Sequence, residues 1–227
     1  MPLIKSFGFR LEKLNRRLAL LVILALSPTA WAQSAAGNSP PGPVRAVKPL
    51  APELTAFALS DAPWQLQGTG ALRFFGLKAY DANLWVASAA PTTPTVNPAV
   101  AKSQFALEIV YNTNIRGEEI VNVSLLEMSR LRKLSNEQIS GWTAAMKKTF
   151  PNVVAGDRLT GVYLPSAGTR FFLNGKLVSE INDPAFGDAF FAIWLDEKTK
   201  RGELRRLLLG QPAPAQPTMP AVVPSNG

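Results

Sequence analysis

The first half of the chain carries the two-residue alternation of apolar and polar positions that is typical of β-strands. In residues 64–74 the apolar positions alternate on either side of Gly68-Thr69-Gly70, which predicts a bend or bulge in a long strand. Residues 77–86 continue as a second strand after Gly76, and residues 105–110 form a third. The Pro/Thr-rich stretch 89–102 between them is expected to be a loop.

The apolar period then changes to that of a helix. Residues 118–133 place apolar side chains on one helical face, with acidic residues in the first turn and basic residues in the last. A second helix begins at once, because Ser135 and Gln138 have the spacing of a capping box. Its apolar stripe consists of Ile139, Trp142, Met146 and Phe150. We therefore expect Trp142 to lie in the core.

The last part of the pattern predicts three further strands and two helices. The strands are expected near residues 159–164, 169–173 and 176–181, with turns at 166–168 and at Asn174-Gly175. Asp183 as N-cap and Pro184 at the first helical position open a third helix. A short last helix, 203–209, ends at Gly210. The fold class is therefore α+β, with an antiparallel sheet covered by helices on one face.

The two ends of the chain differ from this domain. Residues 1–32 combine a basic stretch, the uncharged apolar run 18–26 and an Ala-x-Ala end, which together predict a secretory signal peptide cleaved after Ala32. A retained membrane anchor is the alternative, although the apolar run is short for a bilayer span. Residues 33–52 are a Pro-rich flexible leader, 53–210 the domain, and 211–227 a Pro-rich disordered tail. We expect a periplasmic or secreted protein.

Composition excludes several classes of chemistry. The chain of 227 residues has no His and no Cys, so it lacks His-based catalytic triads, thiolate nucleophiles, disulfides and the usual zinc ligands. The net charge is +8, but residues 1–32 hold five basic residues and one acidic residue. The mature chain keeps 19 basic and 15 acidic residues, or +4, and shows no basic stripe for nucleic acid. We expect no cofactor and no metal.

Arg73 and Tyr80 are the candidate binding residues. Arg73 lies among large apolar residues on one strand, and Tyr80 follows on the next. If the two strands pair, a guanidinium and a phenol can face one apolar cleft, which suits a carboxylate or enolate ligand. The alternative is that Arg73 faces outward on a half-solvated sheet while Tyr80 belongs to the core.

The stretch from Gly68 to Val86 resembles the signature of chalcone isomerase-like proteins: Gly-x-Gly, then Arg73, then Lys-x-Tyr-x-Ala-x-Leu. Further blocks occur in the family's order at residues 150–159, at Asn174-Gly175, at 186–195 and at 207–210. The resemblance covers about residues 60–210. It implies an open-faced β-sandwich with helices layered on a large antiparallel sheet.

The resemblance also bears on activity. Arg73 matches the substrate-anchoring Arg of the plant isomerases, and Tyr80 stands where they carry a Thr, as in the non-catalytic fatty-acid-binding relatives, which hold a carboxylate with Arg and Tyr. Asn174 matches a further polar position. The chain has Arg116-Gly117-Glu118 in place of the catalytic Tyr, and the family's Asn falls near Val123-Ser124. The ligand-binding residues implied are Arg73, Tyr80 and Asn174.

Three functional hypotheses follow. The first is an exported, non-catalytic protein that binds a small amphipathic carboxylate such as a fatty acid. The second is an active isomerase of the intramolecular lyase type, with Arg73 as electrostatic anchor and Tyr80 as proton donor or oxyanion partner. The third is an interaction module of the cell envelope without a small ligand. The sequence does not determine the oligomeric state, and after signal cleavage we expect no stable membrane span.

Overall fold

A computed structural model describes residues 54, 62–74, 76–87, 97 and 103–212. All of them belong to one compact unit, Lys48–Gly227. The predicted signal peptide and leader, and the tail from residue 213, lie outside the described residues, as does the 89–102 loop apart from Asn97.

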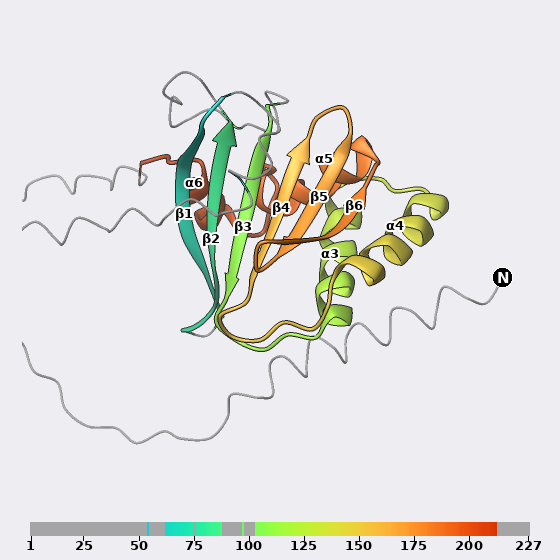
Figure 1. Ribbon diagram of the computed structural model, residues 1–227, viewed down its shortest axis with the longest axis horizontal. Coiled ribbons are helices and arrows are strands. Elements are labelled where there is room, and N and C mark those ends of the chain that lie inside the picture. Colours follow the sequence, from blue (N-terminus) through green and yellow to red (C-terminus); the bar gives the residue numbers. More distant parts are fainter. Residues whose placement is uncertain (1–53, 55–61, 75, 88–96, 98–102, 213–227) are drawn as a thin grey trace, which may run out of the picture. The chain divides into compact units, whose positions relative to one another are not determined.

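Six strands form one antiparallel sheet in which each strand pairs with the next along the chain. Figure 1 shows them in this order across the sheet. They are β1 (Trp64–Phe74), β2 (Leu77–Ala87), β3 (Phe105–Tyr111), β4 (Arg158–Leu164), β5 (Gly168–Leu173) and β6 (Lys176–Ile181). The fold class predicted from the pattern is confirmed.

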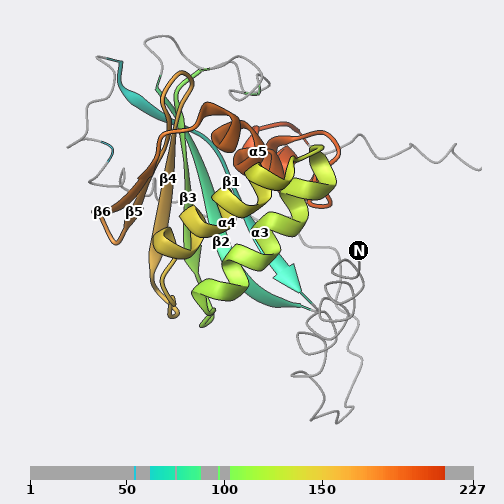
Figure 2. The same ribbon diagram turned by 90° about the vertical axis from the view of Figure 1, so that its right-hand side faces the viewer.

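The helices cover one face of this sheet. They are α3 (Gly117–Leu131), α4 (Asn136–Thr149), α5 (Pro184–Leu195) and α6 (Gly202–Leu208). Figure 2, a side view of the sheet, shows α3, α4 and α5 on the same side of it. The main core lies between this face and the helices, where every second residue of β3 and the apolar stripes of the helices meet. Trp142 is buried there, as predicted.

Capping residues decide where two of these helices begin. The Ser135 hydroxyl accepts from the backbone N–H of Gln138, and the Gln138 side chain accepts from the N–H of Ser135, so the predicted capping box is present. Asp183 accepts from the backbone N–H groups of Ala185 and Phe186 at the start of α5. The other carboxylate oxygen of Asp183 accepts from the indole Nε1 of Trp142 at 2.8 Å. One carboxylate therefore caps α5 and ties it to α4.

The Gly68-x-Gly70 motif has two structural roles. Pairing of β1 with β2 shifts register between Leu66 and Gly68, which is the irregularity that the glycines predict. In addition, a Cβ on Gly68 would lie 2.2 Å from the carbonyl oxygen of Leu207, and one on Gly70 would lie 2.6 Å from the Leu204 side chain. The two glycines therefore allow α6 to pack directly on β1.

The face of the sheet away from the helices is less polar than the alternation suggests. Glu108 points to this face and is 1% exposed, although alternation places it at a solvent position. It accepts a 2.6 Å hydrogen bond from Asn83 Nδ2 and pairs with Arg158 at 3.7 Å. Leu54 and Trp85 belong to a second, smaller apolar cluster on the same face. Burial of the carboxylate is tolerated because it is paired and hydrogen-bonded.

Candidate functional site

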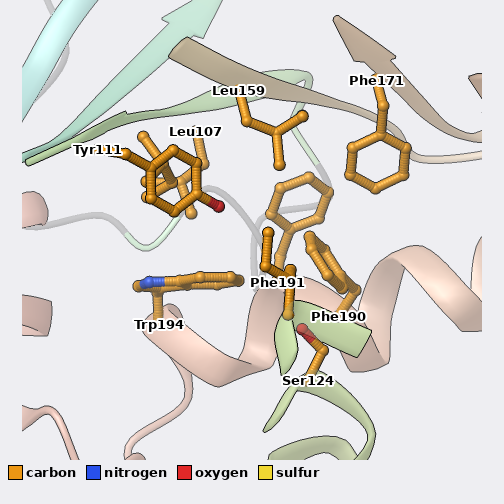
Figure 3. Close-up of a pocket in the computed structure, with 11 residues that line it drawn as sticks. Leu107, Tyr111, Ser124, Leu159, Phe171, Phe190, Phe191 and Trp194 are labelled. Carbon is orange, nitrogen blue, oxygen red and sulfur yellow. The ribbon is translucent and has the colours of Figure 1, made fainter. Parts of the chain in front are cut away.

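A small cavity lies between the sheet and the helices, with a volume of about 30 Å³. Figure 3 shows side chains from β3, β4 and β5 on one side of it, and from α3 and α5 on the other. Its lining consists of Leu107, Ile109, Tyr111, Ile120, Ser124, Leu159, Gly161, Phe171, Phe190, Phe191 and Trp194. The cavity therefore lies within the main core.

Aromatic rings form much of the wall. The Phe190 ring lies 5.3 Å from that of Phe171, 5.4 Å from that of Phe191 and 5.4 Å from that of Trp194, measured between ring centroids. Gly161 on β4 makes room for these rings, since a Cβ there would approach Phe191 to 3.1 Å and Phe171 to 3.2 Å. Such a wall suits the apolar part of a ligand.

Helix α3, which contributes Ile120 and Ser124 to the lining, is held at its N-terminus by a close chain crossing. The backbone N–H of Gly117 donates to Asn152 Oδ1 at 3.0 Å. A Cβ on Gly117 would lie 2.1 Å from the carbonyl oxygen of Phe150, so only glycine fits at this point. Gly117 lies in the region where the family's catalytic Tyr is expected. The close packing explains why a glycine occupies this position.

Tyr80 lies directly behind two residues of the cavity wall. Its hydroxyl accepts a 2.9 Å hydrogen bond from the indole Nε1 of Trp194, and its ring meets that of Tyr111 edge-on at 6.4 Å. Burial raises the pKa of the Tyr80 phenol, while the hydrogen bond from Trp194 and the positive charge of Arg201 act in the opposite direction. The phenol is therefore neutral over the physiological pH range and has a cation in its vicinity.

Arg201 is a residue that the sequence analysis missed. It is the N-cap residue of α6, it is half-buried, and its positive charge acts to lower the pKa of the Tyr80 phenol. In the sequence, Arg201 follows Lys198 and Lys200 in a short basic stretch. Such a stretch is usually a solvent-exposed surface, so it did not indicate a binding residue. Trp194 fell within a block that carried the family resemblance, but nothing in the sequence indicated its hydrogen bond to Tyr80.

Arg73 lies at the hairpin end of β1. Strands β1 and β2 pair as expected, but the register shifts between Leu72 and Arg73, so Leu72 faces Tyr80 and Arg73 faces Lys78. The guanidinium is exposed and donates to the carbonyl oxygen of Gly76 at 3.3 Å. Arg73 does not line the cavity. Arg73 therefore lies as the second interpretation of the sequence expected, on the outside of the sheet. Its role in ligand binding stays a prediction.

Asn174 lies in the turn between β5 and β6, where it adopts a positive φ of 50° before Gly175. Its side-chain oxygen accepts from the backbone N–H of Arg158, and its Nδ2 donates to Asp157, both at 2.9 Å. Both ends of this amide therefore stabilise the turn. Asn174 is exposed and is not part of the cavity lining, so a ligand-binding role for it also stays a prediction.

Comparison with known proteins identifies the family. The family model described as chalcone isomerase-like matches residues 52–210. The chain belongs to the chalcone isomerase-like family. The resemblance seen in the Gly68–Val86 stretch is thereby confirmed, and so is the implied fold. No curated protein gives a significant match.

Among solved structures, this chalcone isomerase-like protein is similar to a fatty-acid binding protein of Arabidopsis thaliana. The TM-score is 0.52 at 12% sequence identity, over 66% of this chain and 88% of the other. Identity this low shows a shared fold alone. In the described part of the chain, no helix is long and apolar enough to cross a membrane. The described residues also include no cluster of three Asp or Glu side chains that could hold a metal ion.

Proposed function

We propose that this protein binds a small amphipathic carboxylate, such as a fatty acid, without catalysing a reaction. The apolar part of the ligand would lie between the sheet and helices α3 and α5, and the carboxylate would meet the Tyr80 hydroxyl. The observation that carries the proposal is the position of Tyr80, whose hydroxyl is hydrogen-bonded to Trp194 and whose ring meets Tyr111, two residues of the cavity wall.

The polar end of such a ligand needs hydrogen-bond donors and a positive charge. A neutral phenol donates one hydrogen bond, and a guanidinium supplies charge and further donors. Arg201 supplies the charge in this proposal, since Arg73 is exposed next to the hairpin turn and its guanidinium donates to the carbonyl oxygen of Gly76. The chain shares its fold with a protein described as fatty-acid binding, which supports the ligand class.

A ligand of this size requires the cavity to widen. Its volume is about 30 Å³, whereas pockets for small organic ligands measure roughly 300–1,000 Å³. The walls that would have to separate are apolar side chains of the sheet and of α3 and α5, which are held by packing rather than by ion pairs. Binding should therefore change the surroundings of Trp194 and, with it, the tryptophan fluorescence.

Catalysis as an isomerase is the second candidate, and it uses the same residue. Tyr80 would have to deliver a proton to the substrate or stabilise an oxyanion. Its pKa is raised, so the phenol stays protonated and can donate a hydrogen bond to an oxyanion, but it is a weaker acid than an unperturbed tyrosine, which disfavours full proton transfer. An absorbance assay with chalcone as substrate decides between the two. Turnover that is lost in Tyr80→Phe would favour the isomerase.

We also propose that the protein is exported, with a mature chain that begins at Gln33, because the three parts of a signal peptide occur in order in residues 1–32. N-terminal sequencing of the exported form tests this. A chain that starts at Met1 and stays with the membrane would mean an anchor instead.

The primary test of the binding function is extraction of the purified protein, followed by mass spectrometry of whatever co-purifies. A stoichiometric fatty acid or similar carboxylate is expected. Absence of any co-purified lipid, together with no binding of added fatty acid, would favour an envelope interaction module without a small ligand.

A further inference from the structure

Two tryptophans on the face of the sheet away from the helices bury an indole N–H group that has no acceptor. They are Trp64 at the start of β1 and Trp85 on β2, and neither Nε1 atom has a hydrogen-bond partner among the described residues. The indole N–H groups of Trp142 and Trp194, by contrast, each donate to an oxygen, at 2.8 Å and 2.9 Å. Burial of a donor without an acceptor is unfavourable, so the first two indoles need a partner.

These two indoles, called the tryptophan pair below, are neighbours on the sheet. Leu66 is the register partner of Trp85, and Trp64 comes two residues before Leu66 on the same strand. Residues in this diagonal relation lie roughly 7–8 Å apart on one face of an antiparallel pair. Both rings pack in the smaller apolar cluster of that face. The tryptophan pair is therefore an aromatic surface with two N–H donors, on the side of the sheet opposite the cavity.

The chain reaches this surface from its N-terminal side. Leu54 belongs to the same apolar cluster and is 2% exposed. An extended chain spans at most about 3.6 Å per residue, so Pro52 has to lie within about 7 Å of Leu54, and Pro49 within about 18 Å. Residues 48–53 belong to the same compact unit as the sheet. This segment is therefore within reach of the tryptophan pair.

The sequence of residues 48–53 suits such a surface. It reads KPLAPE, with two prolines three positions apart. A proline fixes its own φ, and the residue before a proline is restricted to extended backbone, so the segment favours the polyproline II conformation. Carbonyl groups in that conformation have no internal hydrogen bonds and are free to accept. Segments with this proline spacing dock in grooves lined by aromatic side chains.

We propose that residues 48–53 dock on the tryptophan pair as a polyproline II segment. The proline rings pack against the indoles, and backbone carbonyl oxygens of the segment accept from the two Nε1–H groups. The inference goes beyond the proposed function and does not depend on any ligand. It places the end of the Pro-rich leader on the outer face of the sheet, away from the proposed ligand site between the sheet and the helices.

The test observes the indole Nε1–H signals in proton–nitrogen correlation NMR spectra of the mature chain. From residue 33 onward the chain has four tryptophans, so four signals are expected. Trp64→Phe and Trp85→Phe assign the signals of the tryptophan pair. The other two signals, from Trp142 and Trp194, are internal references, because their acceptors lie on the helix side of the sheet.

The test variant combines Pro49→Gly with Pro52→Gly, which removes both rings and the preference for polyproline II. Pro217→Gly combined with Pro220→Gly is the matched control, because it removes two prolines of the same spacing from the tail. Melting curves check that both variants are folded.

The test variant should shift the signals of Trp64 and Trp85 and speed up the exchange of these two N–H groups with solvent about tenfold, the effect of losing one hydrogen bond. The signals of Trp142 and Trp194 should not change, and the control variant should resemble the wild type. Unchanged signals of the tryptophan pair in the test variant would overturn the proposal. Shifts of that pair in the control variant alone would also overturn it, because the tail would then be the occupant.

Discussion

The indole Nε1 of Trp194 donates a 2.9 Å hydrogen bond to the hydroxyl of Tyr80, and the two residues lie 114 positions apart in the sequence. This contact connects β2 with the C-terminal turn of α5 at the edge of the cavity. In this contact the phenol oxygen acts as the acceptor. Its own O–H group therefore remains available as a donor to a ligand oxygen. The same phenol therefore packs in the core and keeps its hydrogen for the ligand that we propose.

Tyr80→Phe should lower the free energy of unfolding by about 1–3 kcal/mol, because the indole N–H of Trp194 then loses its acceptor inside the protein. Urea unfolding of Tyr80→Phe, Trp194→Phe and the double variant measures the interaction. We expect the losses to be non-additive, with the double variant less destabilised than the sum of the two. Strict additivity would contradict a working hydrogen bond.

Gly68→Ala should destabilise the protein by about 1–3 kcal/mol, the usual range for overpacking. The added Cβ would lie 2.2 Å from the carbonyl oxygen of Leu207, so α6 has to move away from β1. Gly141→Ala in α4 is the matched control, since nothing lies within 4 Å of its added Cβ. That variant should be stabilised by about 1 kcal/mol through helix propensity. Equal melting temperatures for Gly68→Ala and the wild type would show that α6 is not fixed on β1.

Trp142→Ala should cost about 3–5 kcal/mol, the range for truncation of a buried large aromatic side chain. Trp142 is 5% exposed and packs edge-on against Phe186 at 5.6 Å. Trp142→Phe keeps most of the packing and loses only the hydrogen bond to Asp183, so a smaller loss of about 1–2 kcal/mol is expected. Denaturant midpoints measure both. A near-zero loss for the Ala variant would be incompatible with the packing of α4.

The turn that contains Asn174 should make stability depend on pH in the acidic range. Hydrogen bonds from the Asn174 side chain, and then from the backbone N–H of Val154, hold the pKa of Asp157 below its usual value. A depressed folded pKa means stabilisation that is present above the unfolded value of about 3.9 and is lost as the pH falls through the folded pKa.

Asn174→Gly removes the amide but keeps a residue that tolerates positive φ. It should therefore flatten the fall in stability below about pH 5, through the unfolded pKa of about 3.9 and the lower folded pKa. Urea unfolding across this range measures the slope, with Asp157→Asn as the control that removes the titrating group altogether. An unchanged slope in both variants would show that the turn does not contribute.

Most of the fold follows from local signals in the sequence. Strand alternation, the capping box at Ser135 and Gln138, and the Asp183-Pro184 helix start are all contained within a few residues, and each is present in the structure. Glu108 was the exception on the sheet. Its burial depends on Asn83 and Arg158 from the two neighbouring strands, and alternation along a single strand carries no information about such partners.

The candidate site was harder to predict, because it depends on register and on long-range contacts. Whether Arg73 and Tyr80 face one cleft depends on strand register. A register shift between Leu72 and Arg73 places Arg73 opposite Lys78, where its exposed guanidinium donates to Gly76; its role in ligand binding stays a prediction. A bulge of this kind has no reliable signature in residue type. Arg201 comes near Tyr80 because α5 and the turn after it fold back over the sheet, which is a property of the tertiary structure.

The most direct test of the central claim is the affinity for stearate of the wild type, Tyr80→Phe, Arg201→Gln and Arg73→Gln, measured by calorimetric titration with melting curves alongside. We predict that Tyr80→Phe and Arg201→Gln each weaken binding by about 1.5–3 kcal/mol, the value of a hydrogen bond to a charged group. Arg73→Gln should stay within about 0.5 kcal/mol of the wild type, as for an exposed substitution. If Arg73→Gln alone lost about 2–5 kcal/mol of binding free energy, the ligand carboxylate would instead bind at the hairpin end of β1. Equal affinities for all four proteins, or binding by none, would contradict a carboxylate site at Tyr80.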